Sequence, residues 1–304
     1  MRQLYGLREK EVIEMAPYQI FTDATADCNP QWLEALPHIV ILPMQVEIGG
    51  REYTYGPDGT LAVEDFYALQ KAGNYATTSQ ITPVQYVQAF EPVLQAGKDI
   101  LYLSFSSGMS GTFQSARVCA EELREQYPER TILCVDTLCA SVGEGFLVCE
   151  AAQRQAEGYT LEELALWVTR HRLEVCHWFT VDVFDHLRRG GRVSAGTAVL
   201  GTALQIKPLL HVNQNGELAV TEKPRGRKQA IRAQLAQMER GWNPQMGKRV
   251  VVGHGACPDG ARALQEAVRE QFPDAEVLTA DIGPIIGAHT GPGMLALIYW
   301  GDTR

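Results

Sequence analysis

The stretch LYLSFSSGMSGTFQSARVCAEEL, residues 101–123, decides how this sequence folds. It begins as an apolar run typical of a buried strand and continues with apolar residues at helical spacing. Hydroxyl side chains and glycines crowd the junction, at Ser104, Ser106, Ser107, Gly108, Ser110, Gly111 and Thr112. A buried strand that runs directly into an amphipathic helix is the repeating unit of a parallel sheet covered by helices.

The same alternation extends through the first half of the chain. Strand-like and helix-like runs follow one another at 19–28, 38–50, 60–73, 82–97, 131–137 and 143–158. Thr82 followed by Pro83 marks a helix start, because threonine is a good N-cap and proline suits the first helical position. This order of elements predicts parallel strand pairing.

The second half of the sequence also contains a signal for antiparallel strand pairing. Asn215-Gly216 between two apolar runs predicts a tight hairpin. The chain has 304 residues, and single hydrophobic cores stop growing at roughly 250–300 residues. We therefore expect an α/β protein of two domains. Residues 18–165 would form a mostly parallel sheet with flanking helices, and 166–304 an α/β domain with a mixed sheet.

The bulk composition excludes several classes of protein. The net charge is −9 and the basic residues form no long run, which argues against a nucleic-acid surface. The seven cysteines are scattered without a CxxC pair, so reduced core thiols are favoured over disulfides or a zinc site. The N-terminus is charged and no window of ~18 apolar residues occurs, so a cytoplasmic location is the default expectation.

Four polar turns in the first half are candidates for ligand binding. They are FTDATAD (21–27), YATTSQITP (75–83), SFSSGMSGT (104–112) and VDTLCASVGEG (135–145). Ligands of open α/β sheets bind at the carboxyl ends of strands, and helix starts favour anions. Each hydroxyl could instead cap its own helix, and for a single turn that interpretation is the better one. The signatures GxSxG, GxGxxG and GxxxxGK[ST] are absent, so neither a nucleophile elbow nor a nucleotide site is indicated.

Two arginine clusters stand out against the acidic background. They are HLRRGGRVSAG (186–196) and EKPRGRKQAIR (222–232). The guanidinium group suits phosphate, carboxylate or an acidic partner. A solvated surface explains the clusters about equally well.

Together these stretches resemble the DegV family. The resemblance runs from about Ile20 to Trp300 and rests on seven motifs in order: FTDATAD, TTSQITP, SFSSGMSGTFQSA, VDTLCASVGEG, LRRGGRVSAGTAVLGTALQIKPLL, KPRGRKQA and IGPIIGAHTGPGM. It implies a two-domain protein that binds one long-chain fatty acid, C14–C18, between its domains. It also implies a carrier subunit without catalysis or cofactor, which presents the carboxylate to a separate ATP-dependent fatty acid kinase.

The resemblance also implies roles for particular residues. The carboxylate ligands fall on Thr78, Ser107 and His289, with Thr77, Ser106 and Gly108 as neighbouring candidates. The arginines associated with the acyl phosphate or with kinase docking fall on Arg192 and Arg225. No metal ligand is implied.

This sequence departs from the family pattern at two turns. Ala24 stands where the family usually has serine, which puts one head-group hydrogen bond in doubt, and Thr137 follows Asp136 where serine is usual. The twenty or so residues before the first motif have no assigned role. Candidates for the acyl channel, which core packing explains equally well, are Val199, Leu200, Leu204, Ile206, Ile285 and Ile286.

Two other functions remain open at this point. The chain could be a hydrolase or transferase acting on a small phosphorylated or carboxylated metabolite, with Ser107, His289 and the arginines as its machinery. It could also be an interaction protein that docks a partner through its arginines. The sequence specifies neither acyl chain length and saturation, nor the existence of a kinase, nor the oligomeric state.

Overall fold

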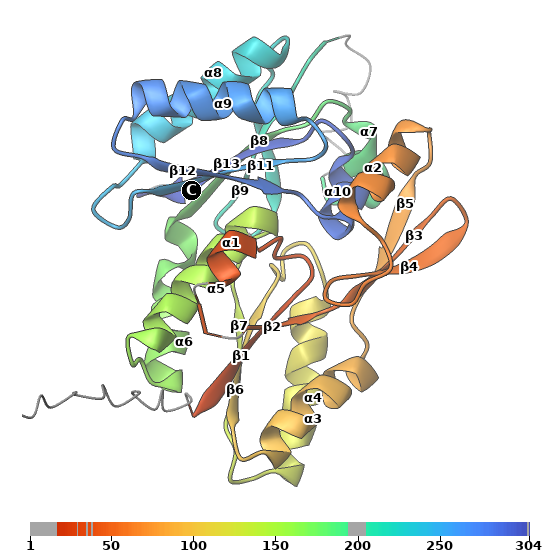
Figure 1. Cartoon of the computed structure of the whole chain (residues 1–304), viewed down its shortest axis with the longest axis vertical. Coiled ribbons are helices and arrows are strands. Elements are labelled where there is room, and N and C mark those ends of the chain that lie inside the picture. Colours follow the sequence, from red (N-terminus) through yellow and green to blue (C-terminus); the bar gives the residue numbers. More distant parts are fainter. Residues whose placement is uncertain (1–16, 29, 35, 38, 194–204, 303) are drawn as a thin grey trace, which may run out of the picture.

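The computed structural model describes residues 17–28, 30–34, 36–37, 39–193, 205–302 and 304. Most of the twenty N-terminal residues therefore lie outside the described part. So do the channel candidates Val199, Leu200 and Leu204. Within it the chain forms two lobes built on two larger sheets, with a small third sheet at one side (Figure 1). The α/β fold, with a parallel sheet first and a mixed sheet second, is confirmed.

The first lobe contains a parallel sheet in the order β2-β1-β6-β7. A three-stranded antiparallel sheet, β4-β3-β5, extends from it. The elements of this half are β1 (Tyr18–Asp23), α1 (Pro30–Leu33), β2 (Ile39–Leu42), β3 (Met44–Ile48), β4 (Arg51–Tyr55), α2 (Val63–Lys71), β5 (Ala76–Ser79), α3 (Pro83–Gln95), β6 (Asp99–Ser104), α4 (Thr112–Gln126), β7 (Ile132–Asp136), α5 (Ser141–Ala156) and α6 (Leu161–His171).

The second lobe contains a six-stranded mixed sheet in the order β10-β9-β8-β13-β11-β12. Only its β11–β12 pair is parallel among the described strands. Its elements are η1 (Arg172–Glu174), β8 (Val175–Thr180), α7 (Asp185–Gly190), β9 (Leu209–Val212), β10 (Leu218–Glu222), α8 (Arg227–Gly241), β11 (Arg249–His254), α9 (Pro258–Gln271), β12 (Glu276–Asp281), α10 (Pro284–Thr290) and β13 (Leu295–Trp300).

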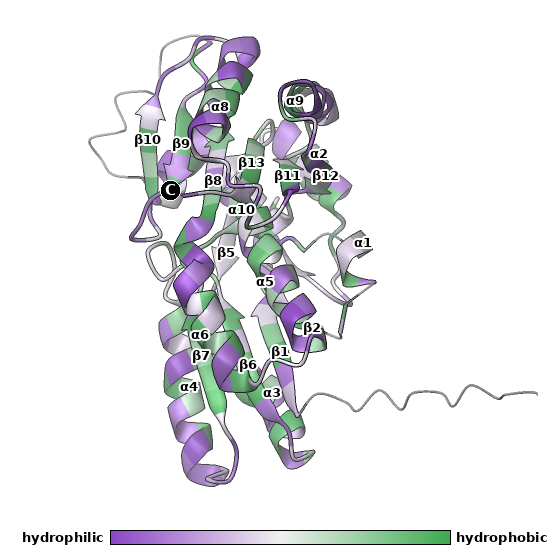
Figure 2. Ribbon diagram, turned by 90° about the vertical axis from the view of Figure 1, so that its left-hand side faces the viewer, coloured by the Kyte–Doolittle hydropathy of each residue, from purple (hydrophilic) through white to green (hydrophobic). Residues whose placement is uncertain are grey.

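Local sequence signals explain several element boundaries. Thr82 and Gln85 form a capping box at the start of α3, and Pro83 occupies its first turn as expected. Gly216 has φ +74° in the turn between β9 and β10, a left-handed conformation that glycine adopts without strain. Outer helices such as α4 and α6 alternate hydrophobic and hydrophilic residues along their length (Figure 2), which lets one face pack on a sheet while the other meets water.

Helix α5 lies between the lobes (Figure 1). Every residue from Ser141 to Ala152 is buried, although the helix follows a strand of the first sheet and packs on β8, β11 and β13 of the second. One hydrophobic cluster therefore runs from Leu101 of the first sheet through Phe146 of α5 to Trp300 of the second. The domain boundary predicted at 165/166 falls inside α6 and stays a prediction.

Candidate functional site

A cavity lies between the two lobes. The space it encloses, counted together with its open mouth, is about 870 Å³. Both lobes contribute hydrophobic side chains to its wall: Met44, Phe105, Met109, Val142, Phe179, Leu187, Val212, Leu218, Ile285, Ile286, Met294, Ala296 and Ile298. The channel candidates Ile285 and Ile286 line it, whereas Ile206 is not among its lining residues.

The topology of the first sheet explains where this cavity opens. The chain passes from β1 to β2 on one side and later places β6 on the other. Such a reversal of strand order leaves a crevice at the carboxyl ends of the two strands. Thr25, which follows β1, and Phe105, Met109 and Ser110, which follow β6, all line the cavity. The serine-rich turn of 101–123 is thus part of the cavity wall.

One set of polar residues on the cavity wall lies close together. The Thr78 hydroxyl lies 2.9 Å from Nε2 of His289, although the two residues are 211 positions apart. Gln80 and Ser110 also line the cavity, and the Gln80 side chain lies against Gly111, next to Ser110. Arg192 completes this region, because its Nε donates to the carbonyl of Met109 at 3.2 Å.

His289 is neutral at physiological pH. Burial, and secondly the positive charge of Arg192, lower the pKa of His289 to about 4. The Nδ1 atom of this ring has no hydrogen-bond partner among the described residues. A Cβ on Gly190 would lie 2.5 Å from Nδ1, so only glycine allows α7 to approach the ring this closely.

The structure separates the residues predicted around Ser107 from the cavity. Ser107 is exposed and its backbone N–H donates to Oδ1 of Asp136 at 3.1 Å. Ser106 is buried, and its hydroxyl donates to the carbonyl of Gly216 in the second lobe at 2.7 Å. Gly108 lies against the same hairpin turn, where a Cβ would be 2.5 Å from the carbonyl of Asn215. None of these three is among the residues that line the cavity.

Thr77 and Arg225 also lie away from the cavity lining. Thr77 is exposed and alternates with the half-buried Thr78 along β5. Arg225 is exposed as well. The structure thus brings Thr78, His289 and Arg192 together, and leaves Ser107, Thr77 and Arg225 outside the group. Whether each binds a ligand remains a prediction.

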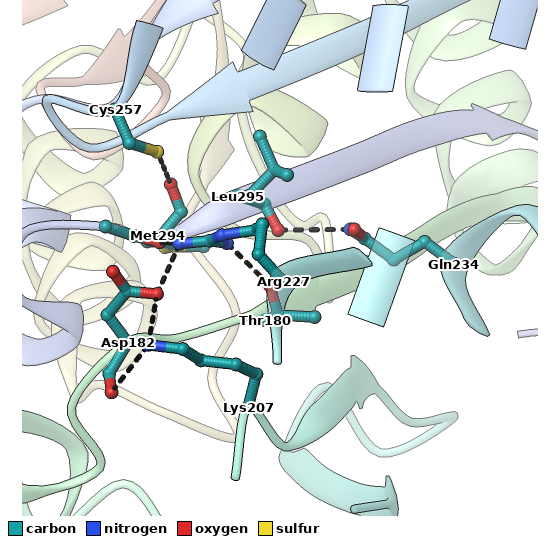
Figure 3. A network of polar contacts seen from close by, with 9 residues as sticks. Thr180, Asp182, Lys207, Arg227, Gln234, Cys257, Met294 and Leu295 are labelled. Carbon is teal, nitrogen blue, oxygen red and sulfur yellow. Dashed lines mark hydrogen bonds and ion pairs between the residues drawn. The ribbon is translucent and has the colours of Figure 1, made fainter. Parts of the chain in front are cut away.

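Sequence reasoning missed the second arginine of the KPRGR motif. Arg227 and Lys207 converge on the carboxylate of Asp182 (Figure 3). The same figure shows Arg227 beside Thr180 and the start of β13. The alternation of Gly226 with two arginines was visible in the sequence, but nothing in it indicated which arginine points inward.

Buried acids lie beneath the inner wall of the cavity. The hydroxyl of Thr25 contacts Oδ1 of Asp23 and lies 2.8 Å from Oε2 of Glu144. Burial raises the pKa of both carboxyl groups, that of Glu144 well above its usual range. One threonine proton cannot serve two carboxylates, so at least one acid is protonated.

Asp27 joins three segments of the two lobes. It accepts hydrogen bonds from the hydroxyl of Ser141 at 2.6 Å and from the backbone N–H of Gly283 at 2.9 Å. Burial nevertheless raises the pKa of Asp27 to about 7. The folded protein therefore holds this proton more tightly than the unfolded chain, whose aspartates have a pKa of ~3.9.

We expect the free energy of unfolding to fall as the pH rises from about 4 to about 7, because this stabilising protonation is lost as the pH passes through the folded pKa. In Asp27→Asn the amide oxygen can still accept from the N–H of Gly283, and the amide NH₂ can donate to the hydroxyl of Ser141, which reverses that bond. Asparagine also tolerates the positive φ of 42°, so the variant should show a shallower slope. Urea titrations of both proteins between pH 4.5 and 8 measure the difference. Identical slopes would show that Asp27 does not titrate in this range.

Within the described ranges, no group of three or more histidine, cysteine or acidic residues could hold a metal ion. Nor does any helix in those ranges combine the length and apolar character that a bilayer crossing requires.

Comparisons with known proteins agree on one family. Residues 17–302 match the family model described as "Uncharacterised protein, DegV family". A DegV domain-containing protein of Clostridium perfringens is 39% identical over 290 residues, which cover 95% of this chain and 99% of that protein.

Solved structures share the fold. A DegV family protein from Thermus thermophilus, described for its fatty acid binding, superposes with a TM-score of 0.82 at 28% identity, covering 94% of this chain and 99% of its own. The fatty acid kinase B3 protein of Streptococcus pneumoniae, loaded with linoleic acid, also has a TM-score of 0.82, with 21% identity and the same coverage; at that identity it shows the fold alone. On the family match and the identity to its relatives, this chain belongs to the DegV family.

Proposed function

We propose that this protein binds one long-chain fatty acid between its two lobes. The observation that carries the proposal is the cavity itself, whose wall is largely hydrocarbon while Thr78, Ser110, His289 and Arg192 adjoin one part of it. The fatty-acid binding described for the T. thermophilus relative supports the same assignment. The tail would lie along the apolar wall and the carboxylate would meet the polar group.

The energetics suit such a ligand. Each CH₂ group that leaves water contributes ~0.8 kcal/mol, so a C16 tail supplies most of the affinity. A carboxylate at the polar end needs several donors to offset its desolvation. Thr78 and Ser110 supply neutral hydroxyls, and Arg192 supplies a positive charge on the exposed side.

The unpartnered Nδ1 of His289 bears on how Thr78 acts. A neutral ring carries one proton, and placing it on Nε2 gives it an acceptor in the Thr78 oxygen. The Thr78 hydroxyl proton is then free to point at the ligand. His289 would thus orient the threonine rather than bind the acid as a cation.

Ser110 is a better candidate than Ser107 for the second hydroxyl ligand. Ser110 lines the cavity, and its hydroxyl lies 2.8 Å from that of Thr112 at the start of α4. Ser107, three residues earlier in the same turn, faces solvent. This proposal keeps the turn that the resemblance implies and moves the hydroxyl ligand from Ser107 to Ser110.

We further propose that the bound acid is presented in the cytoplasm to a separate fatty acid kinase, with the carrier performing no chemistry of its own. This step rests on the family resemblance and on the exposed Arg192 and Arg225. The hydrolase alternative is less well supported, because the hydrogen bond described for Ser107 is made by its backbone N–H, not by its hydroxyl. A nucleophilic serine needs a base within reach of its oxygen.

Native mass spectrometry of the freshly purified protein tests the proposal. We expect an added mass equal to one C14–C18 acid, lost on denaturation and identified by lipid extraction. Titration of delipidated protein with palmitate and oleate should restore the adduct at a ratio of one per chain. A chain that carries no acid and takes up neither on titration would refute fatty-acid binding.

A further inference from the structure

Arg227 lies at the centre of a network of polar contacts in the second lobe (Figure 3). It is the first residue of α8. Its Nη1 donates to the hydroxyl of Thr180 at 3.1 Å, and its Nη2 donates to the carbonyl of Gly293 at 2.6 Å and to Oδ1 of Asp182. Lys207 pairs with the same carboxylate oxygen at 2.9 Å.

The contacts require an arginine. Three acceptors from two segments, Thr180 and Asp182 at the end of β8 and Gly293 before β13, surround one guanidinium, whose planar fork presents several donors in fixed directions. The single ammonium of a lysine carries three donors at one point and cannot span the same acceptors. Gly293 allows the close approach: it has φ +87°, and a Cβ there would lie 2.4 Å from Oδ2 of Asp182.

The residues that Arg227 holds are next to the cavity wall. Thr180 is the last residue of β8, and its neighbour Phe179 lines the cavity. Gly293 lies two residues before the start of β13, and its neighbour Met294 lines the cavity too. Because Thr180 pairs with Leu295 across the two strands, Arg227 ties β8 and β13 together where each reaches the cavity.

The contacts of Arg227 also bear on the polar residues of the cavity, through His289. Gly293 lies in the short turn between α10, which carries His289, and β13. The turn is held further by the N–H of Gly293, which donates to the carbonyl of Gly255 at 2.7 Å. Arg227 thus holds the segment on which both Met294 and His289 depend.

We propose that Arg227 is a positioning residue which, with Asp182, sets the acyl-chain selectivity of the cavity by fixing Phe179 and Met294. This rests on the proposed function of fatty-acid binding. A wall held in one place admits chains up to a given length and excludes longer ones, whereas a wall free to shift accommodates both. Arg225, two residues earlier and exposed, has no part in this tie.

The test compares Arg227→Lys with Arg225→Lys as the matched control. Affinities are measured for saturated acids from C12 to C20 in two-carbon steps. In the natural protein we expect affinity to rise about 15-fold per step until the chain fills the cavity, and then to fall. Arg225→Lys should reproduce that profile, whereas Arg227→Lys should lose at least fivefold of the discrimination between the best acid and the next longer one.

A general loss of stability would lower every affinity by the same factor, so a profile for Arg227→Lys parallel to that of the natural protein would overturn the proposal. If Arg227→Lys does not fold, Asp182→Asn decides by the same criterion, because it removes the ionic contacts of Asp182 with Arg227 and Lys207 and keeps the shape of the side chain. If the natural protein binds no acid, fatty-acid binding itself has failed. The methyl NMR resonance of Met294 in the ligand-free protein then decides on positioning: it should shift in Arg227→Lys and stay in place in Arg225→Lys, and an unmoved resonance in both would overturn it.

Discussion

Replacing Thr78 by valine is expected to weaken fatty-acid binding by roughly 10- to 100-fold, the value of a hydrogen bond to a charged group. Valine keeps the shape of threonine and removes the hydroxyl that we place against the carboxylate. It also leaves Nε2 of His289 without its acceptor, 2.9 Å away in the natural protein. Isothermal titration calorimetry with palmitate measures the loss.

Thr77→Val is the matched control, because Thr77 lies on the same strand with its side chain exposed. It should leave the affinity within about twofold of the natural value. The same contrast applies to the serine-rich turn, where Ser110→Ala should weaken binding and Ser107→Ala should not. Equal losses for Thr77→Val and Thr78→Val would show that the carboxylate does not lie at this end of the cavity.

Replacing Trp300 by alanine is expected to reduce the free energy of unfolding by about 3–5 kcal/mol, the cost of deleting a large buried aromatic side chain. Trp300 is 1% exposed. Its ring packs edge-on against Phe146 of α5, with centroids 5.1 Å apart, and against Trp167 of α6 at 6.0 Å. The indole N–H has no hydrogen-bond partner among the described residues, so the loss reflects packing alone. Urea denaturation followed by circular dichroism measures it.

The control for this variant is Trp242→Ala. Trp242 is half-buried on the outer face of the second sheet and packs against Phe272, with centroids 5.3 Å apart. Its removal should cost clearly less than that of Trp300. Comparable costs for the two would contradict the central place given to the contact between α5 and β13.

Signals that depend on neighbouring residues predicted much of the fold. Thr82 and Pro83 begin a helix as predicted, and Asn215-Gly216 forms the expected hairpin turn. The small antiparallel sheet was less visible: REYTY (51–55) is short and largely polar, yet it pairs with β3 across the glycine turn at 49 and 50. Its pairing is decided by tertiary contacts that a local pattern does not contain.

The site was predicted at the level of motifs but not of atoms. Thr78 and His289 meet only because β5 and α10 pack together, and no spacing rule connects positions so far apart. Within the serine-rich turn, each residue's direction depends on backbone dihedrals, so that Ser106 faces the second lobe, Ser107 faces water and Ser110 faces the cavity. For the same reason, the sequence did not indicate that Arg227 points inward while Arg225 is exposed.

The shared burial of α5 has a consequence for how the molecule can be divided. A fragment ending near residue 165 would strip from this helix the strands β8, β11 and β13, which cover it in the intact chain, and would expose an apolar stripe to water. Such a truncation should yield aggregated material rather than an independently folding half, and heating the whole protein should produce a single cooperative melting transition. Genetic dissection of this protein is therefore better attempted with point substitutions than with deletions.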